Sequence, residues 1–169
     1  MVEEVIVNKV AQSGLITIDL EKYFPVGDRL VIDIKDQLYM GLILKEKDFR
    51  DYIKATDWNQ YKNKNIAITC TADAIVPTWA YMLLATKLSV VADFFVFGDL
   101  TVLNTVLYLK ALEKINPSDY TDKRVVIKGC GNLPVPESAY VEITRLLMPN
   151  VKSLMFGEPC STVPLYKKS

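Results

Sequence analysis

From residue 66 onward, short apolar segments typical of strands alternate with longer segments typical of helices. The expected strands cover residues 66–69, 94–97, 125–128 and 152–156, and the expected helices cover residues 77–88, 101–115 and 136–148. Parallel strands that follow one another through a helix require right-handed crossovers, and the helices then pack on the sheet. The pattern therefore predicts an α/β fold with a mostly parallel core sheet flanked by helices on both faces.

The N-terminal part of the chain has a different pattern. Residues 15–20 alternate apolar and polar side chains, residues 23–28 contain turn formers, and residues 29–34 resume the alternation. A period of two is typical of half-buried strands. We therefore expect an antiparallel strand pair here, followed by a helix over residues 45–56, so that the complete sheet is mixed.

Length and charge limit the classes of function. The 169 residues suit one domain and contain 20 basic and 20 acidic side chains. No internal repeat and no linker between domains is evident, so we expect a single α/β domain over residues 1–169. Balanced charge argues against a nucleic-acid or anionic-membrane partner. We expect a protein partner or a small molecule instead, and the composition is compatible with a homo-oligomer.

The expected location is the cytoplasm. Glu3 and Glu4 occupy the position where a leader peptide would carry basic residues, and no apolar segment approaches the length of a membrane span. The chain has an odd number of cysteines and no pair separated by two residues. This cysteine usage favours a reducing compartment over a disulfide scaffold.

The three cysteines are the strongest candidates for chemistry in a chain that contains no histidine. Cys70, Cys130 and Cys160 each lie at or just after the carboxyl end of an expected strand. Carboxyl ends of parallel strands open onto the crevice where α/β proteins bind ligands. Three thiolates that meet there could hold zinc or iron, with Asp73 or Glu158 near a fourth position.

Two other interpretations of the cysteines remain open. Free cysteine is often buried as a small apolar side chain, and the separations of 60 and 30 residues match no known zinc motif. Alternatively, one thiolate could be reactive, activated by a helix N-terminus and Lys128 instead of histidine. Without imidazole chemistry, the sequence favours a non-catalytic protein over an enzyme.

A glycine-containing turn follows the strand expected at residues 125–128. Gly129 and Gly131 flank Cys130 ahead of a helix, and such glycines permit close approach of a ligand to the backbone. We therefore predict that Gly129 and Gly131, with Asp73 from the loop after residues 66–69, bind a cofactor. The alternative is that the glycines only allow a tight turn between strand and helix.

Residues 128–140 and 156–166 form two long, specific motifs, and residues 16–20 and 72–81 fit the same pattern. On these motifs the chain resembles a bacterial family of unknown function, domain-of-unknown-function family 2480, over nearly its whole length. Members are often encoded beside components of iron–sulfur cluster assembly. The resemblance thus implies a metal-binding or accessory role in that process, with Cys70, Cys130 and Cys160 handling metal or sulfur.

A second function is compatible with the same sequence. The early strand, loop, strand and helix, followed by residues 94–99, resemble in pattern the regulatory domains of anti-sigma-factor antagonists. The chain would then be a non-catalytic protein-interaction or regulatory module in which the cysteines are structural.

Overall fold

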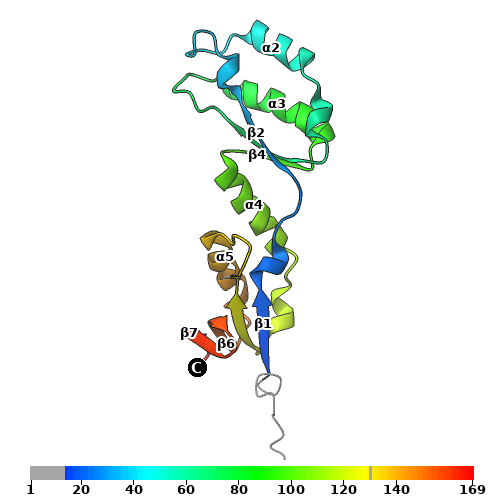
Figure 1. Cartoon of the computed structure of the whole chain (residues 1–169). Coiled ribbons are helices and arrows are strands. Elements are labelled where there is room, and N and C mark those ends of the chain that lie inside the picture. The colour runs from blue at the N-terminus through cyan, green and yellow to red at the C-terminus, as the bar shows by residue number, and fades with distance from the viewer. Residues whose placement is uncertain (1–13, 130) are drawn as a thin grey trace, which may run out of the picture. The chain divides into compact units, whose positions relative to one another are not determined.

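The computed structural model describes residues 14–129 and 131–169, which form two separate sheets (Figure 1). Contacts divide the chain into two units. Unit 1 combines the described residues up to Pro25 with Leu107–Ser169, and unit 2 comprises Val26–Val106. Unit 2 is thus inserted in the sequence of unit 1.

Unit 1 contains a mixed sheet of four strands in the order β1-β5-β6-β7. The strands are β1 (Leu15–Asp19), β5 (Arg124–Lys128), β6 (Ser153–Glu158) and β7 (Ser161–Lys167). Its helical elements are η1 (Leu20–Tyr23), the carboxyl half of α4 (Leu100–Leu112), η4 (Pro117–Tyr120) and α5 (Glu137–Leu147). Ile127 of β5, Ile143 of α5 and Leu112 of α4 belong to one buried apolar cluster, which joins these helices to the sheet.

Unit 2 contains a parallel sheet of three strands in the order β2-β3-β4. The strands are β2 (Arg29–Asp33), β3 (Asn65–Thr69) and β4 (Phe94–Phe97). The helical elements are η2 (Ile34–Gln37), α2 (Glu46–Ala55), η3 (Trp58–Tyr61) and α3 (Thr78–Val91). Buried side chains from β2, β3, α2 and α3 form a second apolar cluster.

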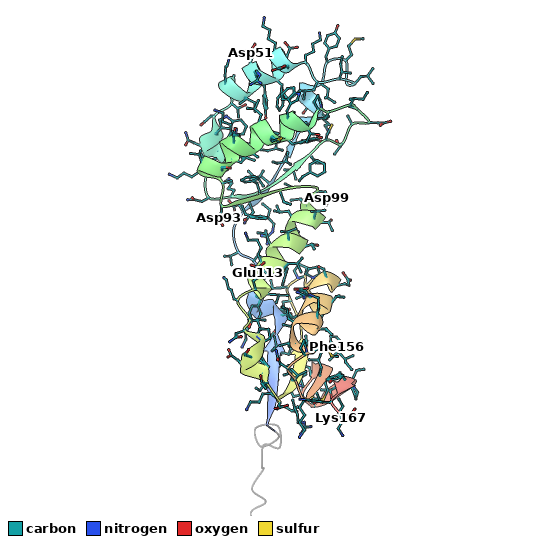
Figure 2. The ribbon with its side chains drawn as sticks, turned by 180° about the vertical axis from the view of Figure 1, so that it is seen from behind. Asp51, Asp93, Asp99, Glu113, Phe156 and Lys167 are labelled. Carbon is teal, nitrogen blue, oxygen red and sulfur yellow. The ribbon has the colours of Figure 1, made fainter. Side chains whose placement is uncertain are left out.

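Local sequence explains these elements. In α2, Phe49 and Ile53 are four residues apart, lie on the same face and are buried, whereas Asp51 lies on the exposed face (Figure 2). In β3, four consecutive residues from Asn65 are buried, as expected for the central strand of a parallel sheet. α3 and α5 begin directly after Pro77 and Pro136, one residue later than the sequence predicted.

The α/β class is confirmed, but the expected N-terminal antiparallel pair is wrong. β1 and β2 lie in different sheets, where β1 is parallel to β5 and β2 is parallel to β3. The antiparallel pair is the C-terminal β6–β7 hairpin instead. The alternating pattern identified two half-buried strands correctly, but it does not specify a partner, which is decided by burial against distant segments. The single domain over residues 1–169 stays a prediction.

The two units repeat one order of elements: strand, 3₁₀ turn, α-helix, 3₁₀ turn, strand, α-helix, strand. In unit 1 these are β1, η1, α4, η4, β5, α5 and β6, and in unit 2 they are β2, η2, α2, η3, β3, α3 and β4. A shift of 14 positions relates Leu15 to Arg29, and a shift of 59 relates Asn65 to Arg124. The strand pairing agrees with both shifts. Leu15 pairs with Arg124 in unit 1, and the equivalent residues Arg29 and Asn65 pair in unit 2.

Backbone and packing details repeat as well. Asn63 and Asp122, 59 positions apart, both have positive φ angles, of 58° and 54°. The same shift relates buried Phe49 to buried Tyr108. It also relates the edge-to-face ring pair Tyr81–Phe97 to Tyr140–Phe156. The chain therefore contains an internal structural duplication.

The expectation of no internal repeat is therefore wrong. Because the first strands are 14 positions apart and the later elements 59, no single shift aligns the whole repeat. Identical residues at equivalent positions are also dispersed, and include Tyr61 and Tyr120, Pro77 and Pro136, and Gly98 and Gly157.

We expect Gly157→Ala to destabilise unit 1. Gly157 has φ of +118°, and a Cβ there would lie 2.6 Å from the carbonyl oxygen of Ser161 in the paired strand. The free energy of unfolding, measured by urea denaturation, should fall by about 2 kcal/mol or more. Gly41→Ala is the control: Gly41 also has positive φ, but a Cβ meets no atom within 4 Å. The control should lose only about 1 kcal/mol, and equal losses would contradict the steric argument.

Candidate functional site

Charged side chains gather at the carboxyl ends of the strands in unit 1. The Lys128 Nζ lies 3.6 Å from Asp19 Oδ2 and 3.3 Å from Glu158 Oε1. The hydrogen bond and charge of Glu158, and then the charge of Asp19, raise the pKa of Lys128 above its usual value. The lysine therefore remains protonated between two carboxylates, which is unsuited to a general base.

Glu21 of η1 holds the glycine-containing turn in place. Its carboxylate accepts backbone N–H bonds from Gly131 (2.5 Å) and Asn132 (3.3 Å). A Cβ on Gly131 would overlap this carboxylate, and a Cβ on Gly129 would lie 2.7 Å from the Tyr140 hydroxyl. Both glycines thus allow close packing of the turn. Together with Asp19, Glu21, Lys128 and Glu158 they line a small hollow of about 90 Å³, and cofactor binding by Gly129 and Gly131 stays a prediction.

The equivalent loop of unit 2 is held by a different carboxylate. Asp33 Oδ1 accepts the backbone N–H groups of Lys35 (3.0 Å) and Thr71 (3.1 Å), and Oδ2 accepts the Thr71 hydroxyl at 2.6 Å. Partial burial raises the pKa of Asp33, but the hydrogen bonds from Thr71 and Lys35 outweigh it, so the pKa lies below its usual value. The ionised carboxylate of Asp33 thus stabilises the loop.

The predicted cysteine site is not supported by the residues that the structure describes. Cys70 follows β3 in unit 2, is half-buried and packs against the apolar cluster of that unit. Cys160 is exposed in the turn between β6 and β7 of unit 1, and Cys130 lies outside the described residues. Within residues 14–129 and 131–169, no group of three cysteine, aspartate or glutamate side chains is placed to hold a metal ion. The predicted Asp73 is exposed in the loop after β3.

The strands that precede Cys70 and Cys160 belong to two different sheets, whereas the sequence predicted one. The sequence predicted a single core sheet whose strand ends all open onto one crevice. Cys70 instead follows a strand of the three-stranded sheet, whereas Cys160 follows a strand of the four-stranded sheet.

An exposed apolar surface on unit 2 was missed by the sequence analysis. It consists of four side chains from the loop between η2 and α2 and one from the loop after β3, namely Tyr39, Met40, Leu42, Ile43 and Ile75, all exposed. We call this set the apolar loop patch. The apolar segment at residues 38–44 was its only signal in the sequence, since apolar runs normally indicate buried elements.

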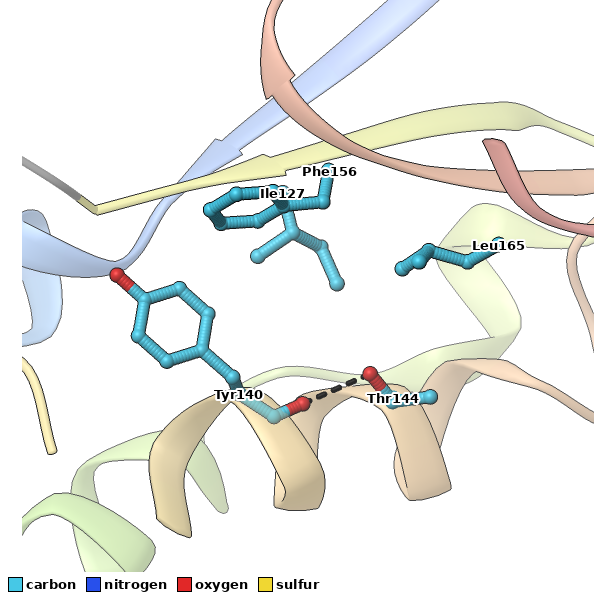
Figure 3. A pocket seen from close by; sticks show the side chains of 5 residues that line it. All are labelled: Ile127, Tyr140, Thr144, Phe156 and Leu165. Carbon is cyan, nitrogen blue, oxygen red and sulfur yellow. Dashed lines mark hydrogen bonds between the residues drawn. The ribbon is translucent and has the colours of Figure 1, made fainter. Parts of the chain in front are cut away.

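Unit 1 contains an apolar pocket of about 330 Å³ (Figure 3). Its lining comes from three strands and one helix: Ile127 of β5, Tyr140 and Thr144 of α5, Phe156 of β6 and Leu165 of β7. The Thr144 hydroxyl donates a hydrogen bond of 2.7 Å to the Tyr140 carbonyl oxygen and is thereby satisfied. This pocket was not predicted from the sequence, because its lining depends on the β6–β7 hairpin.

Comparison with protein families gives one match, a protein family of unknown function designated DUF2480, over residues 4–168. The chain belongs to the DUF2480 family. No curated protein and no solved structure matches this DUF2480 chain. Among the residues described, no helix has the length and apolar character needed to cross a membrane. The resemblance seen in the sequence is therefore confirmed at the level of the family, and the cytoplasmic location stays a prediction.

The pH dependence of stability should reveal the role of Asp33. Because its pKa is lower in the folded chain, its contribution is present above the unfolded value of about 3.9 and is lost as pH falls through the folded pKa. Asp33→Asn should therefore lower the free energy of unfolding near pH 7, and its difference from the native chain should shrink below about pH 4. Asp36→Asn, at a neighbouring exposed position, is the control. A difference that persists unchanged at low pH would contradict this account.

We expect Cys70 and Cys160 to behave as independent thiols. Exposed Cys160 should react quickly with a thiol reagent and half-buried Cys70 slowly, with both rates unaffected by a chelator. Site-specific labelling followed by mass spectrometry of the intact full-length chain, with elemental analysis of the same sample, measures this. If the thiols became reactive only after chelation, and zinc or iron were released, the result would support the predicted metal site.

Proposed function

We propose that this DUF2480 protein is a non-catalytic protein-interaction module that binds a protein partner through the apolar loop patch of unit 2. The observation that carries the proposal is the exposure of five large apolar side chains on two adjoining loops. Met40 and Ile75 are each 78% exposed, and Leu42 is 60% exposed. Contiguous exposed apolar side chains of this kind mark protein-binding surfaces.

Backbone hydrogen bonds hold the patch in a defined conformation. The Tyr39 N–H donates to the Ile43 carbonyl at 2.7 Å, and the Ile75 N–H donates to the Leu42 carbonyl at 3.1 Å. Met40 and Gly41, which form the turn between Tyr39 and Leu42, both have positive φ angles. The Lys45 ammonium lies 3.1 Å from the centre of the Tyr39 ring. A preformed surface loses less conformational entropy on binding than a flexible loop does.

Charge near the patch favours a protein over a polyanion. Lys35 and Lys45 are neighbours of the patch residues in sequence, but so are Asp36 and Asp73. An anionic membrane or a nucleic acid would require an excess of basic side chains there. Mixed charge around an apolar centre is instead the usual anatomy of a protein interface.

We extend the proposal to the class of partner, which we propose to be a component of iron–sulfur cluster assembly, as the resemblance in the sequence implies. The described residues supply no metal-binding group. The proposed role is that of an accessory protein that contacts another assembly component.

Replacing Met40 and Ile75 by serine should weaken partner binding. Both side chains are exposed, so the double variant removes apolar contact area while the fold remains intact. The test is quantitative cross-linking and affinity capture of the full chain at its natural level in its own cell. The amount of a stoichiometric partner captured with the double variant should be at least about tenfold lower than with the native chain, because the variant lacks two anchors of the interface.

Val90→Ser is the matched control, because Val90 is 84% exposed on α3 of the same unit and lies outside the patch. This control should retain the partner. Equal capture by the native chain and by the double variant would refute the patch as the binding site.

A further inference from the structure

We propose that the apolar pocket of unit 1 is a binding site for an uncharged, largely apolar small molecule of about the size of a bicyclic aromatic compound. This site is in the other unit from the apolar loop patch and does not depend on the proposed function. It is formed by Ile127, Tyr140, Thr144, Phe156 and Leu165.

The side chains converge on a common space from opposite sides. Ile127 and Phe156 lie on the sheet side, Tyr140 and Thr144 lie on α5, and Leu165 closes the space from β7 (Figure 3). Leu165 is 54% exposed although it forms a wall of the pocket. An apolar molecule in the pocket would remove this wall from water, which is favourable in proportion to the area covered.

The duplicated unit shows that one wall of this pocket is an addition to the common structure. The shift of 59 positions places Ile68, Tyr81, Ala85 and Phe97 of unit 2 at the positions of four lining residues. Their ring pair Tyr81–Phe97 has centroids 5.0 Å apart, whereas Tyr140–Phe156 is 5.8 Å apart. Leu165 has no counterpart in unit 2, because β7 follows the last repeated strand. The wider ring pair and the additional strand therefore distinguish the unit that contains the pocket.

Volume and lining define the class of ligand. An apolar cavity of about 150 Å³ holds benzene, so about 330 Å³ accommodates a molecule of roughly twice that size. None of the five lining side chains is charged, and the Thr144 hydroxyl hydrogen is already donated. A charged ligand would lose hydration in such a site without gaining an ionic partner. The site therefore favours a neutral compound.

The test is titration of the full chain with indole, followed by NMR of methyl groups. Methyl signals of Ile127, Thr144 and Leu165 should shift saturably, while that of Ile68, at the equivalent position in unit 2, should not. Indole-3-acetate, which has a similar ring system but a carboxylate, should bind at least about tenfold more weakly.

Two variants test the location of the site. Thr144→Phe should fill the pocket and raise the dissociation constant for indole at least about tenfold. Val141→Phe is the matched control, because it adds the same ring at an exposed position of α5 outside the pocket, and binding should be retained. If Thr144→Phe does not fold, Leu165→Ala provides the same test by removing the exposed wall, and indole should again bind more weakly.

Three results would overturn the proposal. The first is the absence of any saturable shift up to the solubility limit of indole. The second is indole binding that neither Thr144→Phe nor Leu165→Ala weakens. The third is a shift of the Leu165 methyl signals with protein concentration alone, which would show that a side chain of a second copy of the chain occupies the pocket.

Discussion

The parallel pairing of β1 with β5 is the constraint on which the rest of the structure depends. Leu15 pairs with Arg124, so the two strands of one sheet are separated by the entire sequence of unit 2. Bringing two such distant strands together costs much chain entropy before any contact is gained. The burial of Ile18, Val125 and Ile127 in one apolar cluster offsets this cost. β2–β3 pairing in unit 2 closes a much shorter segment.

The duplication accounts for much of the architecture and for how the units have diverged. Asp19 and Asp33 occupy equivalent positions, and each accepts the N–H two residues later in a 3₁₀ turn. Asp33 also holds the following loop, through Thr71. In unit 1, Glu21 holds Gly131 and Asn132 of the corresponding loop, and Asp19 contacts Lys128. The repeated backbone thus carries different charged contacts, with Lys128 beside Asp19 and Glu158 in unit 1 and Lys35 beside Asp33 in unit 2.

Each of the two proposed binding surfaces includes a segment outside the repeated elements. The apolar loop patch belongs mainly to the connection between η2 and α2, and one wall of the apolar pocket, Leu165, belongs to β7. In unit 1 the corresponding connection is occupied by the insertion of unit 2. Added segments on a repeated scaffold can acquire binding surfaces without disturbing the buried clusters, because loops tolerate change better than cores do.

The sequence by itself determined β1 to β6 and the four α-helices, because their signals are local, whereas β7 was not predicted. Prolines mark the starts of α3 and α5, and alternating side chains mark β1 and β2. Only the tertiary structure decided which strands pair, since a half-buried strand can join any sheet that covers its apolar face. That decision separated Cys70 from Cys160 into different sheets and left residues 39–43 on a surface. Local pattern fixes what a segment becomes, whereas the burial available to the whole chain fixes its neighbours.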